Sequence, residues 1–545
     1  MTTFAGPSAD SEPGIGALTL GGLLAETAAA HRGREALVFR EPDGSGSVRW
    51  TYEDLLQESR TMARALLAAG MVKGTRVALL MGNRPTWVSA AFGAAMAGGV
   101  VVPVNTYFEA MEVEYVLRHS DAAILLMQEE LAGHAYLEGV KLVCPSLPSP
   151  QLPFLRRVAC LGTDSWDELV GQADDVPEAD LDACMAQVSP FDDAMIIYTS
   201  GTQSHPKGVL HAHRPPALQS WRFARLLGLD ETTRAWSAFP LFWTAGFCMV
   251  MGATLAAGGC LVMQDRFEPG EALELLQSEA VTAAHAWPHQ MAALEGHPAW
   301  GAADLSSLRQ VDASSAFARH PTVRPPESPW SPRAAYGLTE TFTVVTSYPS
   351  DTPPEERGES QGPVLPGSVV RIVDPATGEE LPAGGHGEIA VKGTTLMKGY
   401  VKVAPEECFD PEGFFRTGDA GYFDDQGRLH WSGRISELIK TGGANVSPVE
   451  IEEILIEHPG LKAARVVGVP DPVFGEVVVL CAVAQEGWRM TEDEVIGFLK
   501  GRLASYKIPR RVLFVSDDEL SMTANAKIRS AALRQLAAER LAGGG

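Results

Sequence analysis

Hydroxyl groups, glycines and one lysine gather in a short segment that runs from Thr199 to Lys207. The segment follows the apolar run 195–197, which reads as a buried strand. Glycine allows backbone angles closed to other residues, and several hydroxyl groups with one ammonium group can converge on an anion. The candidate ligands are Thr199, Ser200, Gly201, Thr202, Gln203 and Lys207. This composition indicates a loop for a triphosphate. It is not the P-loop pattern, and a plain polar hairpin has a similar composition.

Four further segments carry side chains suited to nucleotide chemistry. They are Tyr-Gly-Leu-Thr-Glu at 336–340, Arg-Thr-Gly-Asp at 416–419, the stretch from Gly-Arg at 433 to Glu-Ile-Glu at 450–452, and Asn-Ala-Lys-Ile-Arg at 525–529. Together with the first loop, and in the same order, they resemble the signature motifs of the adenylate-forming superfamily. That superfamily includes luciferases, peptide-synthetase adenylation domains and acyl-CoA synthetases, and the resemblance is closest to the acyl-CoA synthetases. Five motifs in register are far more specific than any one of them.

The resemblance implies a nucleotide site. Tyr336 would stack on adenine, Thr339 would contact the α-phosphate, and Glu340 would help to hold Mg²⁺, which needs only one or two protein carboxylates when phosphates supply further oxygens. Asp419 would accept hydrogen bonds from both ribose hydroxyls, and Arg434 would contact the same nucleotide. The remaining residues expected to line the adenosine site are Gly337, Ser314, Ser315 and Ala316, where the serines replace a glycine pair usual in relatives.

The resemblance also implies catalytic and mobile parts. Lys527 would bridge the substrate carboxylate and the α-phosphate, which aligns them and neutralises developing charge. With Glu340 and Thr202 it makes the expected catalytic set. Ser436 stands at the family's hinge, and Gly442 and Gly443 resemble a loop that lines a tunnel for the pantetheine arm of CoA.

Aromatic residues mark the expected acyl pocket. The segment 240–246 resembles the part of the family that closes over the acid, so Trp243, Phe247 and Trp287 are pocket candidates. Aromatic clusters are also common in plain cores. No charged group appears among these candidates, which favours a medium- or long-chain, aryl or polycyclic acid. His211 and His213 have no third ligand nearby, so we expect a solvated strand end there and not a metal site.

Composition sets further bounds. The chain has 545 residues and a net charge of −24, which argues against broad nucleic-acid or anionic-membrane surfaces. A bound polyanion therefore needs local cations, and the candidates are Lys207, Arg416, Arg434, Lys527 and Arg529. The seven scattered cysteines show no ligand spacing, which indicates a reducing compartment and a cytoplasmic protein. The apolar stretch 245–263 is split by two glycines, so we expect an interior helix and strand and no transmembrane segment.

Strand and helix patterns alternate along most of the chain, which predicts an α/β fold. We expect a disordered tail over 1–16, an N-terminal AMP-binding domain of doubly wound sheets over 17–432, and within it a small β-barrel-like sub-domain over about 366–432. A hinge over 433–437 would lead to a small mobile α+β C-terminal domain over 438–545. The stretch 145–190 reads as a connector.

These expectations combine into an ATP-dependent carboxylic acid:CoA ligase that uses Mg²⁺. It would form an acyl-adenylate with release of pyrophosphate, and after rotation of the C-terminal domain an acyl-CoA thioester with release of AMP. Two alternatives stay open. The first keeps the adenylation and changes the second step, either to transfer onto a carrier protein or to a luciferase-like oxidation. The second alternative is a catalytically silent nucleotide-binding homologue. The second is suggested by departures from the family pattern at Ser436, Ala526, Trp243 and Ser314–Ser315. The particular acid and any homo-oligomeric state are not determined by the sequence.

Overall fold

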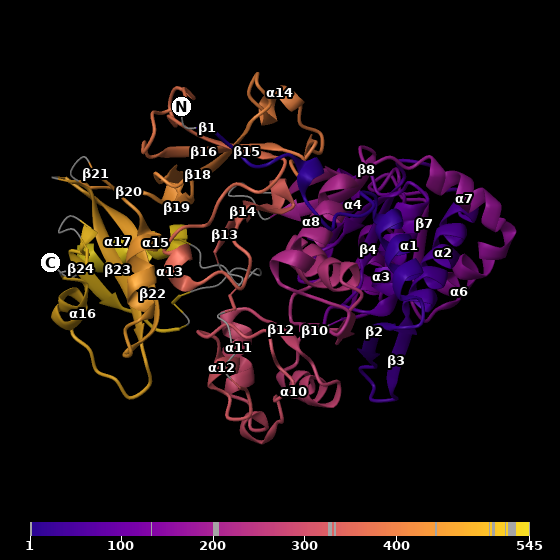
Figure 1. The fold of residues 1–545 in the computed structure, drawn as a ribbon, viewed down its shortest axis with the longest axis horizontal. Helices are drawn as coiled ribbons and strands as arrows, with labels where there is room; N and C mark the ends of the chain where they lie inside the picture. The colour runs from indigo at the N-terminus through magenta and orange to yellow at the C-terminus, as the bar shows by residue number, and fades with distance from the viewer. Residues whose placement is uncertain are drawn as a thin grey trace. The chain divides into compact units, whose positions relative to one another are not determined.

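The computed structural model describes residues 3–131, 133–199, 206–324, 330–331, 334–441, 444–472, 474–500, 502–503, 507–517, 519–520 and 530–543. The chain forms two compact units (Figure 1). The larger unit comprises Phe4–Val369 and Val391–Phe415, and the smaller comprises Met1–Thr3, Val370–Ala390 and Arg416–Gly545.

A seven-stranded sheet in the larger unit has the order β17-β9-β8-β5-β4-β6-β7. Its strands are β4 (Arg76–Leu80), β5 (Val100–Pro103), β6 (Ile124–Met127), β7 (Arg157–Cys160), β8 (Asp193–Thr199), β9 (Lys207–Ala212) and β17 (Gly399–Tyr400). The pairs from β8 to β7 are parallel, whereas β9 runs antiparallel to β8 and β17. Strand β7 and the helices after it fall in the predicted connector, which is therefore part of the fold.

Both faces of this sheet are covered. In β4, Val77 and Leu79 belong to one buried cluster, whereas Ala78 and Leu80 belong to another. A strand buried on both faces reads as a continuous apolar run, as β4 does. The helices around it are α1 (Leu20–His31), α2 (Tyr52–Ala68), α3 (Pro85–Met96), α4 (Ala110–His119), α5 (Tyr136–Val143), α6 (Asp164–Gly171) and α7 (Glu178–Ala186). Helices α1, α2 and α3 pack on one another (Figure 1).

A second sheet has the order β12-β10-β11-β2-β3 and is parallel except at β3. Its strands are β2 (Glu35–Arg40), β3 (Ser47–Thr51), β10 (Arg234–Ser237), β11 (Cys260–Met263) and β12 (Ala283–His285). Helices in the same stretch of the chain are α8 (Arg214–Leu226), α10 (Pro269–Ser278), α11 (Pro288–Glu295) and α12 (Ala316–Arg319). Two doubly wound sheets agree with the α/β prediction.

The apolar stretch 245–263 forms the π-helix η3 (Ala245–Gly252), the short helix α9 (Ala253–Ala256) and strand β11. The glycine pair separates helix from strand as predicted. Within the described ranges, no helix combines the length and apolar character that a bilayer crossing requires.

The predicted disordered tail is wrong for most of its length. Residues of this segment form β1 (Thr3–Ala5) and η1 (Ala9–Ser11). The Glu12 side chain is only 4% exposed and accepts two hydrogen bonds from Arg222, at 2.9 Å from Nε and 2.7 Å from Nη2. Two charge-assisted bonds to a buried arginine fix the segment, and sequence composition does not reveal such a partner.

The remaining elements of the larger unit include β13 (Ala335–Leu338), η5 (Thr339–Thr341) and β14 (Thr343–Ser347). Strands β13 and β14 form an antiparallel pair. The short helices α13 (Pro354–Arg357) and α14 (Pro405–Cys408) complete this unit.

The smaller unit combines two sheets with helices. Strands β15 (Ser368–Val373), β16 (Gly387–Gly393), β18 (Phe415–Phe423) and β19 (Leu429–Arg434) are neighbours in that order and lie mainly in this unit. The second sheet consists of β20 (Ile439–Thr441), β21 (Ala444–Val446), β22 (Leu461–Asp471), β23 (Gly475–Ala484) and β24 (Arg511–Phe514). The helices are η6 (Ile435–Glu437), α15 (Pro448–Ile456), α16 (Glu492–Leu499) and α17 (Ser530–Gly543). The exact domain boundaries proposed from the sequence stay a prediction.

Candidate active site

The predicted phosphate loop joins two antiparallel strands. Thr199 ends β8 and Lys207 begins β9, and these two residues are register partners. The candidates Ser200, Gly201, Thr202 and Gln203 lie outside the described residues. Because β8 is parallel to β5, the loop leaves the sheet at the edge where β4, β5 and β6 also end. Open α/β sheets bind ligands outside the carboxyl ends of their strands.

Tyr400 connects two residues that the sequence assigns to the nucleotide site. Its hydroxyl donates a hydrogen bond to Glu340 Oε1 over 2.6 Å, and the Lys207 ammonium lies 4.9 Å from the centre of its ring. The candidate phosphate ligand and the candidate metal carboxylate therefore share one neighbour. Tyr400 could not be predicted from the sequence, because only the pairing of β17 with β9 brings it to this position.

The backbone after Glu340 takes rare angles. Phe342 has φ 48° and Thr343 has φ 87°, a left-handed conformation that is unusual for any non-glycine residue and most of all for a β-branched one. The Thr341 hydroxyl donates to Thr343 O over 2.8 Å and so helps to hold this turn. A Cβ added to Gly337 would lie only 1.6 Å from Thr343 O, so the turn needs glycine at that position. Such strain is often found at functional sites.

His211 and His213 are buried, so the prediction of a solvated strand end is wrong. His211 Nε2 lies 2.8 Å from Thr339 O, and its ring packs edge-on against Phe342 with centroids 4.9 Å apart. His213 Nδ1 accepts from Leu20 N over 3.4 Å. Burial lowers the pKa of each imidazole to about 4, so both are neutral near pH 7. His211 thereby acts as a fixed donor to the backbone of the predicted α-phosphate ligand.

The predicted adenine-lining residues lie in two places. Tyr336 is buried in β13, opposite Thr346 of β14. Ser314 and Ser315 belong to a turn closed by Asp312. Its Oδ1 accepts from Ser314 N over 2.8 Å and from Ser314 Oγ over 2.6 Å, and its backbone oxygen accepts from Ser315 Oγ over 2.7 Å. Both serine hydroxyls thus have partners inside the turn, and α12 begins at the next predicted residue, Ala316. Contact of these residues with adenine stays a prediction.

The smaller unit brings Asp419 and Arg434 together. They are register partners on β18 and β19, and Arg434 Nε lies 3.0 Å from Asp419 Oδ1. Arg434 Nη1 also donates to Thr417 O over 2.8 Å. Arg416, a candidate for polyanion binding, instead pairs with the buried Glu388, with 2.7 Å between Nε and Oε2. Its guanidinium therefore has a structural partner.

The other predicted positions of this unit are only partly described. Ser436 lies in η6. Gly442, Gly443, Lys527 and Arg529 lie outside the described residues.

The segment 239–243, which overlaps the predicted acyl-pocket segment 240–246, is held by Asn83. Asn83 Nδ2 donates to Phe239 O, and its Oδ1 accepts from Leu241 N, each over 2.9 Å. Asn83 follows β4 of the seven-stranded sheet, whereas Phe239 follows β10 of the five-stranded sheet. The segment therefore lies where strand ends of both sheets meet.

Aromatic rings surround this segment. Trp287 is 39% exposed, and its ring centre lies 4.5 Å from that of Phe239. Trp243 lies 5.2 Å from Phe242 and 6.2 Å from Tyr107, between ring centres. Tyr107 was not predicted from the sequence, although it closely follows the apolar run of β5.

Phe247 differs from the two tryptophans. It is only 1% exposed and packs edge-on against Trp87 and Phe342, with centroids 6.1 Å and 6.0 Å apart. Phe247 is thus a core residue beneath the strained turn, and a direct role in the acyl pocket stays a prediction.

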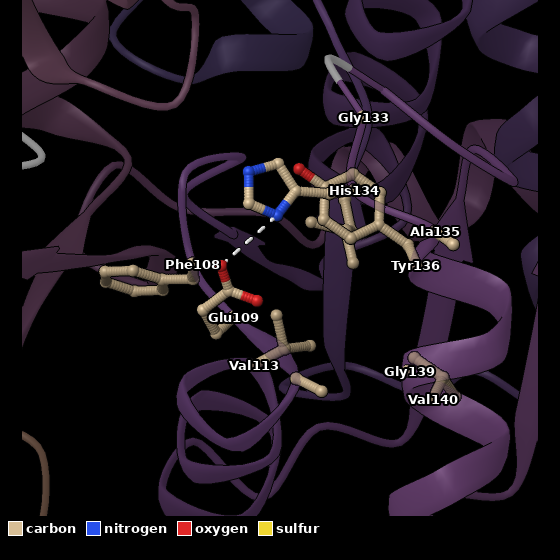
Figure 2. Close-up of a pocket in the computed structure, with 11 residues that line it drawn as sticks. Phe108, Glu109, Val113, Gly133, His134, Ala135, Tyr136, Gly139 and Val140 are labelled. Carbon is tan, nitrogen blue, oxygen red and sulfur yellow. Dashed lines mark ion pairs between the residues drawn. The ribbon is translucent and has the colours of Figure 1, made fainter.

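A cavity of about 330 Å³ lies elsewhere along the seven-stranded sheet (Figure 2). It is bordered by Leu80 at the end of β4, by the segment 108–110 after β5 and by the segment 133–136 after β6. Figure 2 shows His134 and Glu109 turned toward one another, with Nδ1 and Oε1 3.7 Å apart. None of the predicted site residues that the structure describes lines this cavity.

Comparison with known proteins defines the class. The model of the AMP-binding enzyme family matches residues 24–401, and the model of the AMP-binding enzyme C-terminal domain matches residues 450–527. The chain belongs to the AMP-binding enzyme family, within the adenylate-forming superfamily.

Individual relatives narrow the class. The putative acyl-CoA synthetase YngI of Bacillus subtilis is 32% identical over 536 residues, covering 95% of this chain and 96% of the relative. The feruloyl-CoA synthase of an Amycolatopsis species is 33% identical over 500 residues, covering 90% and 94%. The anthranilate CoA ligase AuaEII, solved with anthranoyl-AMP, has a TM-score of 0.79 at 25% identity, covering 98% of this chain and 100% of that one. The protein is an AMP-forming acid:CoA ligase close to the acyl-CoA synthetases, which confirms the predicted family, fold class and enzyme class.

Proposed function

We propose that this ligase activates a hydrophobic acid, of the medium- or long-chain, aryl or polycyclic type, and transfers it to CoA. The aromatic environment of the segment 239–243 carries this proposal. Aromatic side chains bury large apolar area and pack well against rings and chains. Two of the relatives reported above, the feruloyl-CoA synthase and the anthranilate CoA ligase, are named for aromatic acids.

In the first half-reaction, a carboxylate oxygen of the acid attacks the α-phosphorus of ATP, and the bond to pyrophosphate breaks. Lys207 and the hydroxyls of the phosphate loop would hold the phosphates, and Lys527 would align the carboxylate with the α-phosphate. The protein contributes placement and charge stabilisation and needs no side-chain nucleophile.

Glu340 suits a magnesium ion that arrives with ATP. Its Oε1 accepts from Tyr400, which leaves Oε2 for a cation or its waters. Among the described residues, no cluster of three or more His, Cys, Asp and Glu side chains is placed to hold a metal alone. One carboxylate is enough for Mg²⁺ when phosphates and waters complete its shell. When bound, the ion would neutralise charge on the phosphate oxygens.

In the second half-reaction, the thiol sulfur of CoA attacks the acyl carbonyl, the bond to AMP breaks, and the thiol proton is released. Asp419 and Arg434 would hold the ribose through both steps, while Gly442 and Gly443 would border the path of the pantetheine arm. These roles, and Ser436 as the pivot, are part of the proposal.

The test is a panel of carboxylic acids with Mg-ATP and CoA, in which AMP release is followed for the wild type and for Trp287→Ala. We expect hydrophobic acids to be preferred and Trp287→Ala to raise the KM for the acid about tenfold, the effect of one lost apolar contact, with the KM for ATP unchanged. Trp488→Ala is the matched control, because Trp488 is 50% exposed and lies in the smaller unit.

Three results would count against the proposal. The first is a preference for small charged acids, and the second is an unchanged KM for the acid in Trp287→Ala. The third is pyrophosphate release that CoA does not accelerate, which would point to another acceptor.

A further inference from the structure

We propose that Tyr400 is a positioning residue of the adenylation step, which holds Glu340 and Lys207 apart and in place before ATP binds. The inference rests on the proposed roles of those two residues. Tyr400 lies outside every motif that indicated the nucleotide site, so its assignment comes from the structure alone.

The first observation is the hydrogen bond to the carboxylate. A hydroxyl that donates to an ionised carboxylate makes a short and strong bond, and the 2.6 Å between Tyr400 Oη and Glu340 Oε1 fits that kind. The bond occupies one of the two carboxylate oxygens and fixes the rotation of the group. The orientation of the other oxygen, Oε2, toward a cation is thereby restricted. The backbone oxygen of Glu340 is held as well, because it accepts from Met397 N over 2.7 Å.

The second observation is the position of the lysine. The Lys207 ammonium lies over the Tyr400 ring, 4.9 Å from its centre, which is within the range of a cation–π interaction. Lys207 and Glu340 carry opposite charges and do not pair with one another in the structure. A direct ion pair would neutralise both groups before the triphosphate and its cation arrive. With the phenol between them, each charge stays available to its own part of the ligand.

The third observation is that Tyr400 has little freedom to move. Its strand β17 pairs with β9, the strand that begins at Lys207. Lys398 N donates to Leu210 O, and Val401 N donates to Gly208 O, each over 2.8 Å. The backbone on both sides of Tyr400 is thus tied to β9 by hydrogen bonds that involve no ligand.

The experiment measures ATP binding by calorimetry over a series of Mg²⁺ concentrations, with the full chain and no acid or CoA. The variants are Tyr400→Phe, which removes only the hydroxyl, and Tyr400→Leu, which also removes the ring. Tyr348→Phe is the matched control, because its hydroxyl bonds to Ser360 Oγ over 2.9 Å in the same unit.

We expect Tyr400→Phe to raise the Mg²⁺ concentration for half-maximal ATP affinity by about 10- to 100-fold, the usual effect of losing an outer partner of a metal ligand. Tyr400→Leu should in addition weaken ATP binding at saturating Mg²⁺, because the aromatic ring that contacts the Lys207 ammonium is lost. Tyr348→Phe should match the wild type in both measurements.

An unchanged Mg²⁺ dependence in Tyr400→Phe would overturn the inference, as would equal losses in Tyr400→Phe and Tyr348→Phe. If Tyr400→Leu does not fold, the Phe variant alone decides. Because neither acid nor CoA is present, the result is separate from the test of the proposed function, which depends on the acid and on CoA.

Discussion

At the scale of single residues, the segment from Tyr336 to Thr343 is constrained at several positions. It holds the predicted ligands of adenine, phosphate and metal within a few positions, and it ends in two residues with positive φ. His211 binds the backbone of Thr339, and Tyr400 binds the carboxylate of Glu340. The site is therefore preorganised by residues outside the motif, which is how enzymes keep reacting groups in place at little cost in the transition state.

Gly337→Ala tests this preorganisation. A methyl group at that position would meet Thr343 O at 1.6 Å, which only a backbone shift can relieve. A displacement of about 1 Å at reacting groups can lower a rate about 100-fold. We therefore expect a loss of that order in kcat/KM for acid-dependent AMP formation. The control is Gly301→Ala, because nothing lies within 4 Å of the added atom there. Full activity of Gly337→Ala would show that the turn is not needed.

At the scale of elements, much of the fold follows from local patterns. Thr51 caps α2 and Asp54 completes the capping box, a local pattern of residue types that favours a helix start. The apolar runs of β4, β5 and β6 alternate with helix patterns, and such runs are typical of parallel strands covered on both faces. The five sequence motifs also predict which residues form the nucleotide site.

The errors share one physical cause. The bond of Glu12 to Arg222, the burial of His211 and the place of Tyr400 each depend on contacts between segments far apart in the chain. A polar residue looks exposed in the sequence until its distant partner is known, because local composition cannot supply the hydrogen bond that makes burial possible.

Strand β9 gives a prediction about acid stability. The His211 pKa is about 4 in the folded protein, because burial disfavours the charged ring, whereas an unfolded histidine titrates near pH 6.5. Below that pH the unfolded chain takes up a proton that the folded chain does not. The contribution of His211 to the free energy of unfolding is therefore complete above pH 6.5 and is lost as the pH falls toward 4. At pH 5 this loss amounts to about 2 kcal/mol for one such group.

The check is urea denaturation of the wild type and His211→Gln at pH 7 and pH 5. His211→Gln should be less stable at pH 7, because packing against Phe342 is lost. Its further loss between pH 7 and pH 5 should be smaller than that of the wild type by about 2 kcal/mol. Equal losses in both proteins would mean that His211 does not titrate as its burial implies.

At the scale of the whole molecule, the two units carry different parts of the proposed chemistry. The larger unit holds the candidate phosphate, metal and acyl residues, and the smaller holds the ion pair of Asp419 with Arg434. The proposed product of the first half-reaction is an acyl-adenylate. The central claim is that this intermediate forms in the absence of CoA and that CoA then consumes it.

The most direct test follows pyrophosphate, AMP and thioester with an accepted hydrophobic acid and Mg-ATP, with and without CoA. We predict acid-dependent pyrophosphate without CoA, limited to about one equivalent per enzyme, and steady release of AMP with the thioester once CoA is added. Lys527→Ala should slow the first step by about 100-fold or more, as expected for loss of a group that stabilises transition-state charge. Pyrophosphate that needs no acid, a CoA-independent rate, or Lys527→Ala at the wild-type rate would contradict this account.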